Sequence, residues 1–426
     1  MRKRLLTAAV LALLPGCDNS GGPVFGSTGG TAGGIVQSSG GTGGTTMQTA
    51  TGPNVLDVVV DSGPVGLDPP YLDGLFATVT ICEPGTSNCQ NIDHLLVDTG
   101  SVGVRVLESV LTLSLPDAKN AGGQTLAECS GFIDGSSAWG PLKTADVKLG
   151  GETAAGLTVQ VIGVKSFAIP ASCTGTALTD VQTLGAHGFL GIGIFRQDCG
   201  SACALGARSP SNPGQYYACA SACAVASVPL DQQMPNPVAA FPVDNNGVII
   251  RLPSLSASGV PSVSGQLIFG IGTRDNNGLG SATLIPLDAY GDAITTFPVG
   301  GTAYLSFIDS GSNGLFFLNS ATTKLTQCTG AGFTDWYCPS STTSLSATLA
   351  AVSGGDARVD FRVANLLRLP ASSNALDDVA GPMVGFGSDP AVPGFDWGLP
   401  FFFGRSVYTA IESQSTPAGV GPFIAF

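Results

Sequence analysis

A short phrase occurs twice in the sequence, and this repeat constrains the fold more than any other feature. The first copy is LLVDTGSVGVRV, with Asp98 at its centre, and the second is SFIDSGSNGLFF, with Asp309. In each copy an apolar run typical of a buried strand leads into Asp, then Thr or Ser, Gly and Ser. An acid at the end of a buried strand is costly unless something compensates it. The repeat therefore predicts two carboxylates that meet.

Each copy is followed, at a similar spacing, by a glycine within an apolar run. Gly191 lies in HGFLGIGIFRQ after Asp98, and Gly398 lies in FDWGLPFFFGRSVY after Asp309. Two halves with the same order of features indicate an internal duplication. A Gly inside a strand marks the close approach of another backbone. We therefore expect each Gly to let its strand pass directly behind the Asp loop of its own half.

Composition indicates an all-β protein with more than one lobe. The chain has 426 residues, of which 43% are hydrophobic, 11% are charged and 60 are Gly, and this length is sufficient for two cores. The net charge of -13 argues against nucleic acid or an anionic membrane surface as a partner. Strands are expected at residues 55–61, 75–81, 92–98, 144–152, 157–164, 247–253 and 265–272. Short helices are expected at residues 104–111, 319–328 and 406–412.

The N-terminus is predicted to be a targeting segment. Basic residues precede an apolar stretch, residues 5–14, that is too short to cross a membrane as a helix. The Leu-Pro-Gly-Cys that follows resembles the end of a bacterial lipoprotein signal over residues 1–17, in which Cys17 carries the lipid; a plain signal peptide cut nearby is the alternative. Residues 18–53 are rich in Gly, Ser and Thr and are expected to form a flexible tether. The protein is thus expected to be exported and held in the cell envelope or periplasm by its lipid alone.

The cysteines predict disulfides. Of the eleven cysteines, Cys17 is assigned to the lipid, and the even number that remains in an exported chain favours pairing. The expected local pairs are Cys82–Cys89 and Cys328–Cys338, and Cys129 and Cys173 form a third candidate pair. Two C-x3-C units remain, Cys199/Cys203 and Cys219/Cys223. A zinc site is one interpretation of these units, and a disulfide-stapled surface insert is the favoured one.

The duplicated motifs resemble those of the pepsin-like aspartic peptidases. The stretches that carry the resemblance outside the two motifs are YLDGLFATVTICEPG (71–85), the flap-like FIDGSSAWGPLKTADVKLGGE (132–152), GQLIFGIGT (265–273) and GVGPFIAF (419–426). The chain is more similar still to an uncharacterised bacterial lipoprotein family, a domain of unknown function in the acid-protease group. The resemblance implies an all-β, bilobal fold of two duplicated barrel-like lobes, residues 54–275 and 276–426, with an active-site cleft between them.

The resemblance also implies roles for individual residues. Asp98 and Asp309 match the catalytic pair that holds a water molecule. The residues that match the support of this pair are Thr99, Gly100, Ser101, Ser310, Gly311 and Ser312, with the two Ser hydroxyls on the outer carboxylate oxygens and the Gly N–H groups facing the carboxylates. The flap departs from the family pattern because it lacks a Tyr. The nearest positions are Phe132 and Ile133, and Trp139 is the ring that could substitute; the Cys-rich insert, residues 199–223, has no counterpart.

Two adjacent carboxylates have a defined chemistry, because they cannot both ionise and therefore share a proton. The ionised member acts as a base on water, and the protonated member supplies a proton to the leaving amine. A Ser-His-Asp site is not expected, because the only two His, His94 and His187, are interpreted as structural. Asp61 begins a third Asp-Ser-Gly, but the rest of the motif is missing, so it is interpreted as the end of a strand.

Two functional hypotheses follow. The first is an envelope lipoprotein of the aspartic endopeptidase type, a hydrolase that cuts a peptide or protein substrate with a water activated between Asp98 and Asp309. The second is a catalytically inactive protein of the same fold that binds a peptide or glycan at the cell envelope. No metal or cofactor is expected for either, and a monomer is expected for both.

Overall fold

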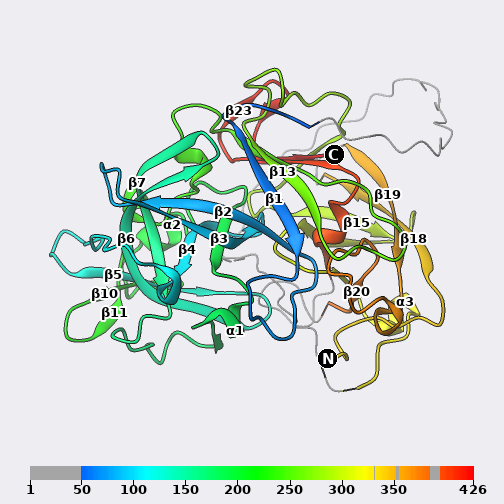
Figure 1. The fold of residues 1–426 in the computed structure, drawn as a ribbon, viewed down its shortest axis with the longest axis horizontal. Coiled ribbons are helices and arrows are strands. Elements are labelled where there is room, and N and C mark those ends of the chain that lie inside the picture. Colours follow the sequence, from blue (N-terminus) through cyan, green and yellow to red (C-terminus); the bar gives the residue numbers. More distant parts are fainter. Residues whose placement is uncertain (1–48, 331, 352–354, 384–393) are drawn as a thin grey trace, which may run out of the picture.

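The structure is a computed structural model that describes residues 49–330, 332–351, 355–383 and 394–426. The predicted lipidation residue Cys17, the predicted signal segment and most of the predicted tether lie outside the described residues. Figure 1 shows two groups of strands side by side, with β1 (Val55–Asp61) and β13 (Val263–Phe269) between them. The described helices α1 (Val181–Leu184), α2 (Ser201–Ala204) and α3 (Ser320–Thr323) are single turns. The all-β prediction is therefore confirmed.

The N-terminal lobe contains a closed barrel. Its strands, in order of pairing, are β2 (Gly74–Cys82), β3 (Cys89–Asp98), β9 (Gly188–Ile192), β4 (Val102–Leu107), β7 (Glu152–Ile162) and β6 (Ser136–Leu149). The pairing of β6 with β2, through Ile81 opposite Val147, closes the ring. Residues on the inner side of these strands, such as Val79, Val104 and Val159, are buried in one hydrophobic core. This burial is what drives an apolar, β-branched sequence into a barrel.

The C-terminal lobe is an open sheet that corresponds to half a barrel. Its strands, in order, are β19 (Asp356–Val363), β18 (Thr343–Ala350), β15 (Ala293–Phe297), β16 (Thr302–Ile308), β21 (Gly394–Trp397), β17 (Leu315–Phe317) and β20 (Ala380–Gly381). Its core is aromatic: Phe317 stacks on Phe395 at 5.1 Å, and Phe395 stacks on Trp397 at 5.5 Å. The two duplicated lobes are thus both present, and the second is open where the first is closed.

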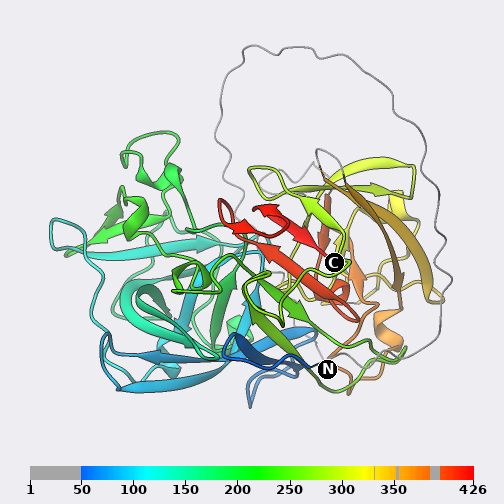
Figure 2. The same ribbon diagram turned by 90° about the horizontal axis from the view of Figure 1, so that it is seen from above.

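A sheet that takes strands from both halves of the chain joins the lobes. Its order is β1, β13, β12 (Gly247–Arg251), β22 (Ser406–Ala410), β25 (Phe423–Ala425) and β14 (Leu284–Pro286). In Figure 2 the red C-terminal strands lie between the two lobes, next to green strands of the N-terminal half. Because β12 pairs with β22, for example Ile249 opposite Tyr408, the two halves of the chain hydrogen-bond to each other directly.

The internal duplication is visible in the topology. In the N-terminal lobe β3 runs parallel to β9, and β9 runs antiparallel to β4. In the C-terminal lobe β16 runs parallel to β21, and β21 runs antiparallel to β17. In each lobe the first strand ends at the Asp motif, the last strand follows that motif, and a third strand returns between them; Gly191 lies in this third strand of the N-terminal lobe, and Gly398 directly follows that of the C-terminal lobe. This arrangement brings each Asp to the end of a buried central strand.

Two of the predicted helices are strands. Residues 104–111 belong to β4 and a 3-10 turn over Glu108–Val110, and residues 406–410 belong to β22. Residues 319–328 contain only the single turn α3. Packing against neighbouring strands determines the secondary structure here, because every apolar residue of β4 is buried on one face of the strand or the other. A strand buried on both faces has no alternation that distinguishes it from a helix.

The structure describes five disulfides, which account for ten of the eleven cysteines. The three pairs predicted with a single partner are confirmed: Cys82–Cys89, Cys129–Cys173 and Cys328–Cys338. The two C-x3-C units each close on themselves, as Cys199–Cys203 and Cys219–Cys223, which excludes the zinc interpretation. Five disulfides are typical of proteins that fold in an oxidising, extracytoplasmic environment. No helix among the described residues is long and apolar enough to cross a membrane.

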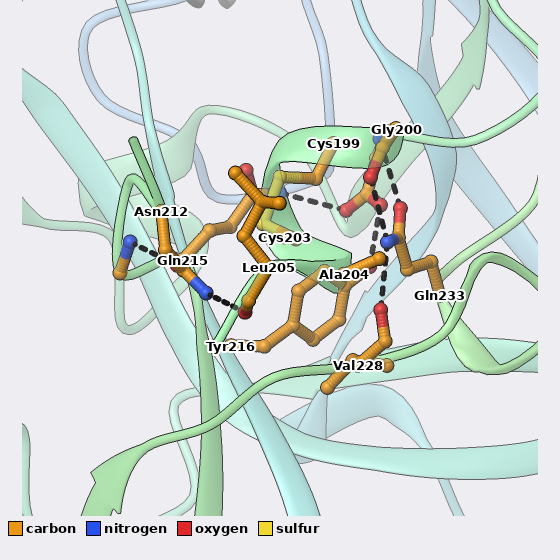
Figure 3. Close-up of a disulfide and its surroundings, with 12 residues drawn as sticks. Cys199, Gly200, Cys203, Ala204, Leu205, Asn212, Gln215, Tyr216, Val228 and Gln233 are labelled. Carbon is orange, nitrogen blue, oxygen red and sulfur yellow. Dashed lines mark hydrogen bonds between the residues drawn. A yellow bond between two sulfur atoms is a disulfide. The ribbon is translucent and has the colours of Figure 1, made fainter. Parts of the chain in front are cut away.

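The Cys-rich insert is packed onto the N-terminal lobe. Its strands β10 (Tyr216–Cys219) and β11 (Cys223–Val225) extend the sheet from β5 (Thr125–Gly131). Figure 3 shows the Cys199–Cys203 disulfide beside the side chain of Gln233, which accepts from Gly200 N at 2.8 Å and donates to Gly200 O and Val228 O. The remaining short strands are β8 (Thr176–Ala177), β23 (Ser415–Thr416) and β24 (Gly419–Val420).

Candidate active site

The two motif aspartates meet at the junction of the lobes. Asp98 is the last residue of β3 and lies opposite Gly191 in the parallel register, and Asp309 directly follows β16. Both side chains are fully buried, and their carboxyl groups lie on either side of Gly100. The Gly100 N–H donates to Asp98 Oδ1 at 2.8 Å, and a Cβ on Gly100 would lie 2.7 Å from the carboxyl carbon of Asp309. The structure therefore brings together two acids that are 211 residues apart in the printed sequence. A buried pair of this kind must share a proton.

Two hydroxyl side chains lock the Asp loops together. Thr99 N donates to Ser310 Oγ at 3.1 Å, and Ser310 N donates to Thr99 Oγ1 at 2.9 Å. The Ser310 hydroxyl in turn donates to Val97 O at 2.8 Å, in the strand that ends at Asp98. These contacts are reciprocal, so each loop fixes the position of the other. Thr and Ser are needed here because their hydroxyls both donate and accept.

Each carboxylate is held by one backbone N–H and one hydroxyl. The contacts are Gly100 N to Asp98 Oδ1 (2.8 Å), Ser101 Oγ to Asp98 Oδ2 (2.5 Å), Gly311 N to Asp309 Oδ1 (2.8 Å) and Ser312 Oγ to Asp309 Oδ2 (2.9 Å). Hydrogen bonds to an ionised carboxylate stabilise its charge and oppose the effect of burial. The six residues expected to support the pair therefore all surround it.

The two partner glycines lie behind the Asp loops. A Cβ on Gly191 would approach Ser101 Oγ and the Val102 backbone to 2.8 Å. A Cβ on Gly398 would approach Gly314 O to 2.1 Å. Any side chain at these positions would push the loops out of place. Gly100 is equally constrained on the inner side, because a Cβ there would lie 2.7 Å from the carboxyl carbon of Asp309.

The surroundings shift the pKa of both acids. Burial raises the pKa of Asp98 well above its usual value, the charge of Asp309 raises it further, and the hydrogen bond from Ser101 opposes the shift. Burial also raises the pKa of Asp309, but the hydrogen bonds from Asp98, Gly311 and Ser312 lower it. The pKa of both acids is thus raised, and because hydrogen bonds oppose the shift more fully at Asp309, we expect Asp98 to retain the shared proton and Asp309 to ionise first.

The flap hairpin consists of β5 and β6, and its turn lies beside the first Asp loop. A hollow of about 40 Å³ is lined by Gly100 and Ser101 from that loop and by Phe132 from the turn. The Phe132 ring also packs on Phe189 at 5.0 Å, and Ile133 is half-buried next to it in the turn. Phe132 and Ile133 thus both lie in the turn between β5 and β6.

Trp139 does not replace a flap tyrosine. Its side chain is 4% exposed, its Nε1 donates to Phe167 O at 3.1 Å, and its ring packs edge-on against Tyr217 at 5.1 Å. The ring therefore packs in a hydrophobic cluster formed with the Cys-rich insert. Among the described residues, no contact joins it to the Asp98–Asp309 pair, which we call the dyad. The sequence did not predict this cluster, because Tyr217 belongs to the Cys-rich insert, whose place in the fold could not be predicted.

A tyrosine that the motif analysis overlooked lies near the dyad. Tyr71 is fully buried between β1 and β2, and its hydroxyl has no hydrogen-bond partner in the described part of the chain. Burial raises the pKa of Tyr71 well above its usual range, and the charges of Asp134, Asp98 and Asp309 raise it further. The only sequence feature that pointed to Tyr71 was its place in the stretch 71–85, which resembles the pepsin-like peptidases.

A buried ionic network supports the first Asp loop from behind. Arg105, on β4, is 2% exposed, and its Nη2 donates to Glu128 Oε1 at 2.9 Å. Gln215, in the Cys-rich insert, donates to the same Glu128 oxygen at 2.8 Å and to Asp198 Oδ2 at 2.8 Å. The network thus connects the strand after Asp98, the flap strand β5 and the insert. Figure 3 shows Gln215 and Tyr216 beside the Cys199–Cys203 disulfide.

A third acid lies next to the dyad, on β21. Asp396 is 2% exposed, and its Oδ2 lies 2.5 Å from Ser312 Oγ, the hydroxyl that also contacts Asp309. This acid belongs to the apolar run around Gly398, and no role is predicted for it from the sequence. Its position two residues before Gly398, inside a run predicted to be buried, was a signal that could have found it.

The His residues and the third Asp motif lie in a separate cluster. His94 contacts Asp93 Oδ2 at 2.9 Å and Asp61 Oδ2 at 3.4 Å, and His187 contacts Asp93 Oδ1 at 2.9 Å. Asp61 ends strand β1 and accepts from Gly63 N, as expected for a strand end. Asp93, His94 and His187 are the one group in the described ranges with the spacing of a metal site. Both ring nitrogens of His94 and Nδ1 of His187 contact carboxylates, which agrees with a structural role.

These features define a two-lobed, all-β protein of the pepsin-like acid-protease fold, with an aspartate pair at the lobe junction. The chain belongs to the DUF3443 family, described as a protein of unknown function, whose sequence profile matches residues 50–426. The fold and family predicted from the motifs are therefore confirmed. Among 318 matching solved chains is the aspartic proteinase from Irpex lacteus, with 15% identity, a TM-score of 0.48, and coverage of 87% of this chain and 96% of that chain. No curated protein matches the sequence.

Proposed function

We propose that this protein is an aspartic-type endopeptidase that hydrolyses peptide bonds with Asp98 and Asp309. One observation carries the proposal: two buried carboxyl groups lie side by side, and each is held by its own backbone N–H and hydroxyl. Burying two acids side by side is unfavourable, so a chemical role explains the pair better than a structural one. Such a pair is the arrangement expected of an acid and a base placed on one water molecule.

The directions of the pKa shifts favour different chemical roles for the two acids. Asp309, the member that ionises first, takes a proton from a water molecule as that water attacks the peptide carbonyl carbon. Asp98, the protonated member, hydrogen-bonds the carbonyl oxygen and stabilises its developing charge. When the C–N bond breaks, a proton passes to the leaving amine, and the pair again holds one proton. No covalent intermediate and no Ser or Cys nucleophile is required.

The flap must move before a peptide can reach the dyad. Both carboxyl groups are fully buried, and the two hollows beside Gly100 and Ser101 each have a volume of about 40 Å³. Ligand pockets usually measure about 300 to 1,000 Å³. The β5–β6 turn lines one of these hollows, so its displacement is the step that would admit substrate.

The same burial favours a second candidate, a protein that binds a peptide or glycan without cutting it. In this case the dyad would be a structural remnant that seals the lobe junction. The two candidates differ in one respect, because ligand binding would survive Asp98→Asn while proteolysis would not.

A cleavage assay tests the proposed activity. The purified protein is incubated with an unfolded, unlabelled protein over a series of acid to neutral pH values, with and without the dyad inhibitor pepstatin. We expect pepstatin-sensitive cleavage that is lost as pH falls through the pKa of Asp309, when the base is protonated, and lost as pH rises through the raised pKa of Asp98, when the acid is ionised. Absence of cleavage at every pH would contradict the proposal and favour the binding candidate.

We also propose that a lipid on Cys17 anchors the protein at the cell envelope. The support is the Leu-Pro-Gly-Cys sequence after an apolar segment, together with disulfides typical of an extracytoplasmic protein. We expect the wild type to fractionate with membranes and Cys17→Ser to shift at least half of the protein to the soluble fraction. An unchanged distribution, with no incorporation of labelled fatty acid by the wild type, would contradict the anchor.

A further inference from the structure

Asp396 is a buried acid, and its surroundings offer little that would stabilise a negative charge on it. It lies on β21 between Phe307 of β16 and Phe316 of β17, neither of which can carry a charge. Its neighbours Phe395 and Trp397 stack on each other in the core, so Asp396 projects from the other face of the strand. Its Oδ1 has no hydrogen-bond partner among the described residues. The ionisable groups that act on it are Asp309 and Asp98, and both are acids.

The contact with Ser312 requires a proton that a hydroxyl alone does not supply. Ser312 Oγ lies 2.9 Å from Asp309 Oδ2 and 2.5 Å from Asp396 Oδ2. A serine hydroxyl has one hydrogen and can donate to only one of these oxygens. The other contact must therefore be a hydrogen bond donated by a protonated carboxyl group. The matching hydroxyl of the other lobe, Ser101, contacts one carboxylate only, so the arrangement is asymmetric.

Asp396 is the better candidate to hold that proton. Asp309 accepts a backbone N–H from Gly311 and a hydrogen bond from Asp98, and both favour its ionised form. Asp396 has no such donor, and a buried carboxylate without a cation is strongly disfavoured. Burial raises the pKa of Asp396 well above its usual value, and the charges of Asp309 and Asp98 raise it further despite the contact with Ser312.

We propose that Asp396 is a positioning residue for the dyad, which remains protonated and donates its hydrogen to Ser312 Oγ. The single hydrogen of Ser312 is then directed onto Asp309 Oδ2. A chain of two hydrogen bonds thus stabilises the ionised form of Asp309, which leaves the shared proton of the pair on Asp98. The consequence for catalysis rests on the proposed peptidase function, but the protonation of Asp396 does not.

Two substitutions separate this role from simple filling of space. In Asp396→Asn the amide can donate to Ser312 in place of the protonated carboxyl, so we expect kcat within about threefold of the wild type and an unmoved acid limb of the pH profile. In Asp396→Leu the donor is lost. We expect kcat to fall about tenfold with KM unchanged, and the acid limb to move to higher pH because Asp309 loses part of its stabilisation. In a Ser312→Ala background the difference between the Asn and Leu variants should disappear.

Two results would overturn the proposal. If Asp396 is ionised in the wild type, Asp396→Asn removes a negative charge beside Asp309 and moves the acid limb to lower pH. If Asp396 only fills space, the Asn and Leu variants will have the same kcat and the same pH profile. Thermal unfolding of each variant identifies any loss of folded protein before these comparisons are made.

Infrared spectroscopy tests the protonation without any activity. At neutral pH the difference spectrum between the wild type and Asp396→Asn should show the loss of a protonated carboxylic acid band. Loss of a carboxylate band would overturn the assignment. If the wild type cleaves no substrate but the acid band is lost, the peptidase function fails while the proton assignment stands.

Discussion

Asp98→Asn will reduce kcat by about 10²- to 10⁴-fold, the range expected for removal of a general acid or base. An amide cannot hold the shared proton that the dyad requires, and it cannot release a proton to the leaving amine. The fold should survive, because the Asn oxygen can accept from Gly100 N in place of Oδ1, and the Asn NH2 group can donate to Ser101 Oγ in place of Oδ2. These two contacts are now 2.8 and 2.5 Å long. Single-turnover cleavage of an unfolded protein, at the pH optimum of the wild type, measures the effect.

The sequence itself supplies a matched control for this substitution. Asp61 also ends a strand and is followed by Ser and Gly, but it contacts His94 and Gly63 and lies outside the dyad. Asp61→Asn makes the same chemical change in the same local motif, and we expect kcat to stay within about twofold of the wild type. Equal activity losses in Asp61→Asn and Asp98→Asn would show that the effect is structural, and full activity in Asp98→Asn would exclude the dyad mechanism.

Arg105→Met will destabilise the protein by about 3 to 5 kcal/mol, because it leaves a buried carboxylate without its cation. Glu128 is fully buried and receives hydrogen bonds from Arg105, Gln215 and Ser130. Burial opposes its ionisation, yet the Arg105 guanidinium lowers the pKa of Glu128 below its usual value. The methionine keeps the apolar volume but supplies no charge. Urea unfolding at neutral pH measures the loss of unfolding free energy.

The pH dependence and a double variant identify the cause. The lowered pKa of Glu128 means that its stabilising contribution is present above the pKa of the unfolded chain and is lost as pH falls through the folded value. The cost of Arg105→Met should therefore shrink at acid pH, and adding Glu128→Gln should recover part of it at neutral pH. A destabilisation that is equal at all pH values would contradict this account.

An exposed arginine provides the comparison. Arg358 contacts Asp360 at 2.8 Å, with the two side chains 63% and 68% exposed. Exposed ion pairs contribute little, so Arg358→Met should change the unfolding free energy by no more than about 0.5 kcal/mol. The contrast between the two substitutions measures what burial adds to an ion pair of the same kind.

The dyad could be predicted because its signal is local. An acid after an apolar run, followed by small hydroxyl residues, is unusual on its own, and the second copy made it specific. The glycines at 191 and 398 were found for the same reason, since a Gly inside a buried strand implies a nearby backbone. The disulfides were predictable where the two cysteines are close in the chain, as in Cys82–Cys89.

The parts that could not be predicted depend on contacts between distant segments. The charge of Arg105 inside the apolar run VGVRV indicates a buried cation, but nothing in the sequence identifies Glu128 or Asp198 as its partners. The position of Trp139 depended on an insert whose docking had no sequence signal. Asp396 was visible as an acid in an apolar run, but its contact with Ser312 follows only from the pairing of β21 with β16 and β17.

The shared sheet between the lobes has a consequence for when the site can form during synthesis. Strand β12, from the first half of the chain, pairs with β22, and β22 pairs with β25 near residue 425. Thr99 and Ser310 hold the two Asp loops only after the lobes are joined. Contacts between such distant segments form late, because their loop-closure entropy must be met first. A chain that is still being synthesised or exported therefore lacks an assembled dyad, which delays any hydrolytic activity until folding is complete.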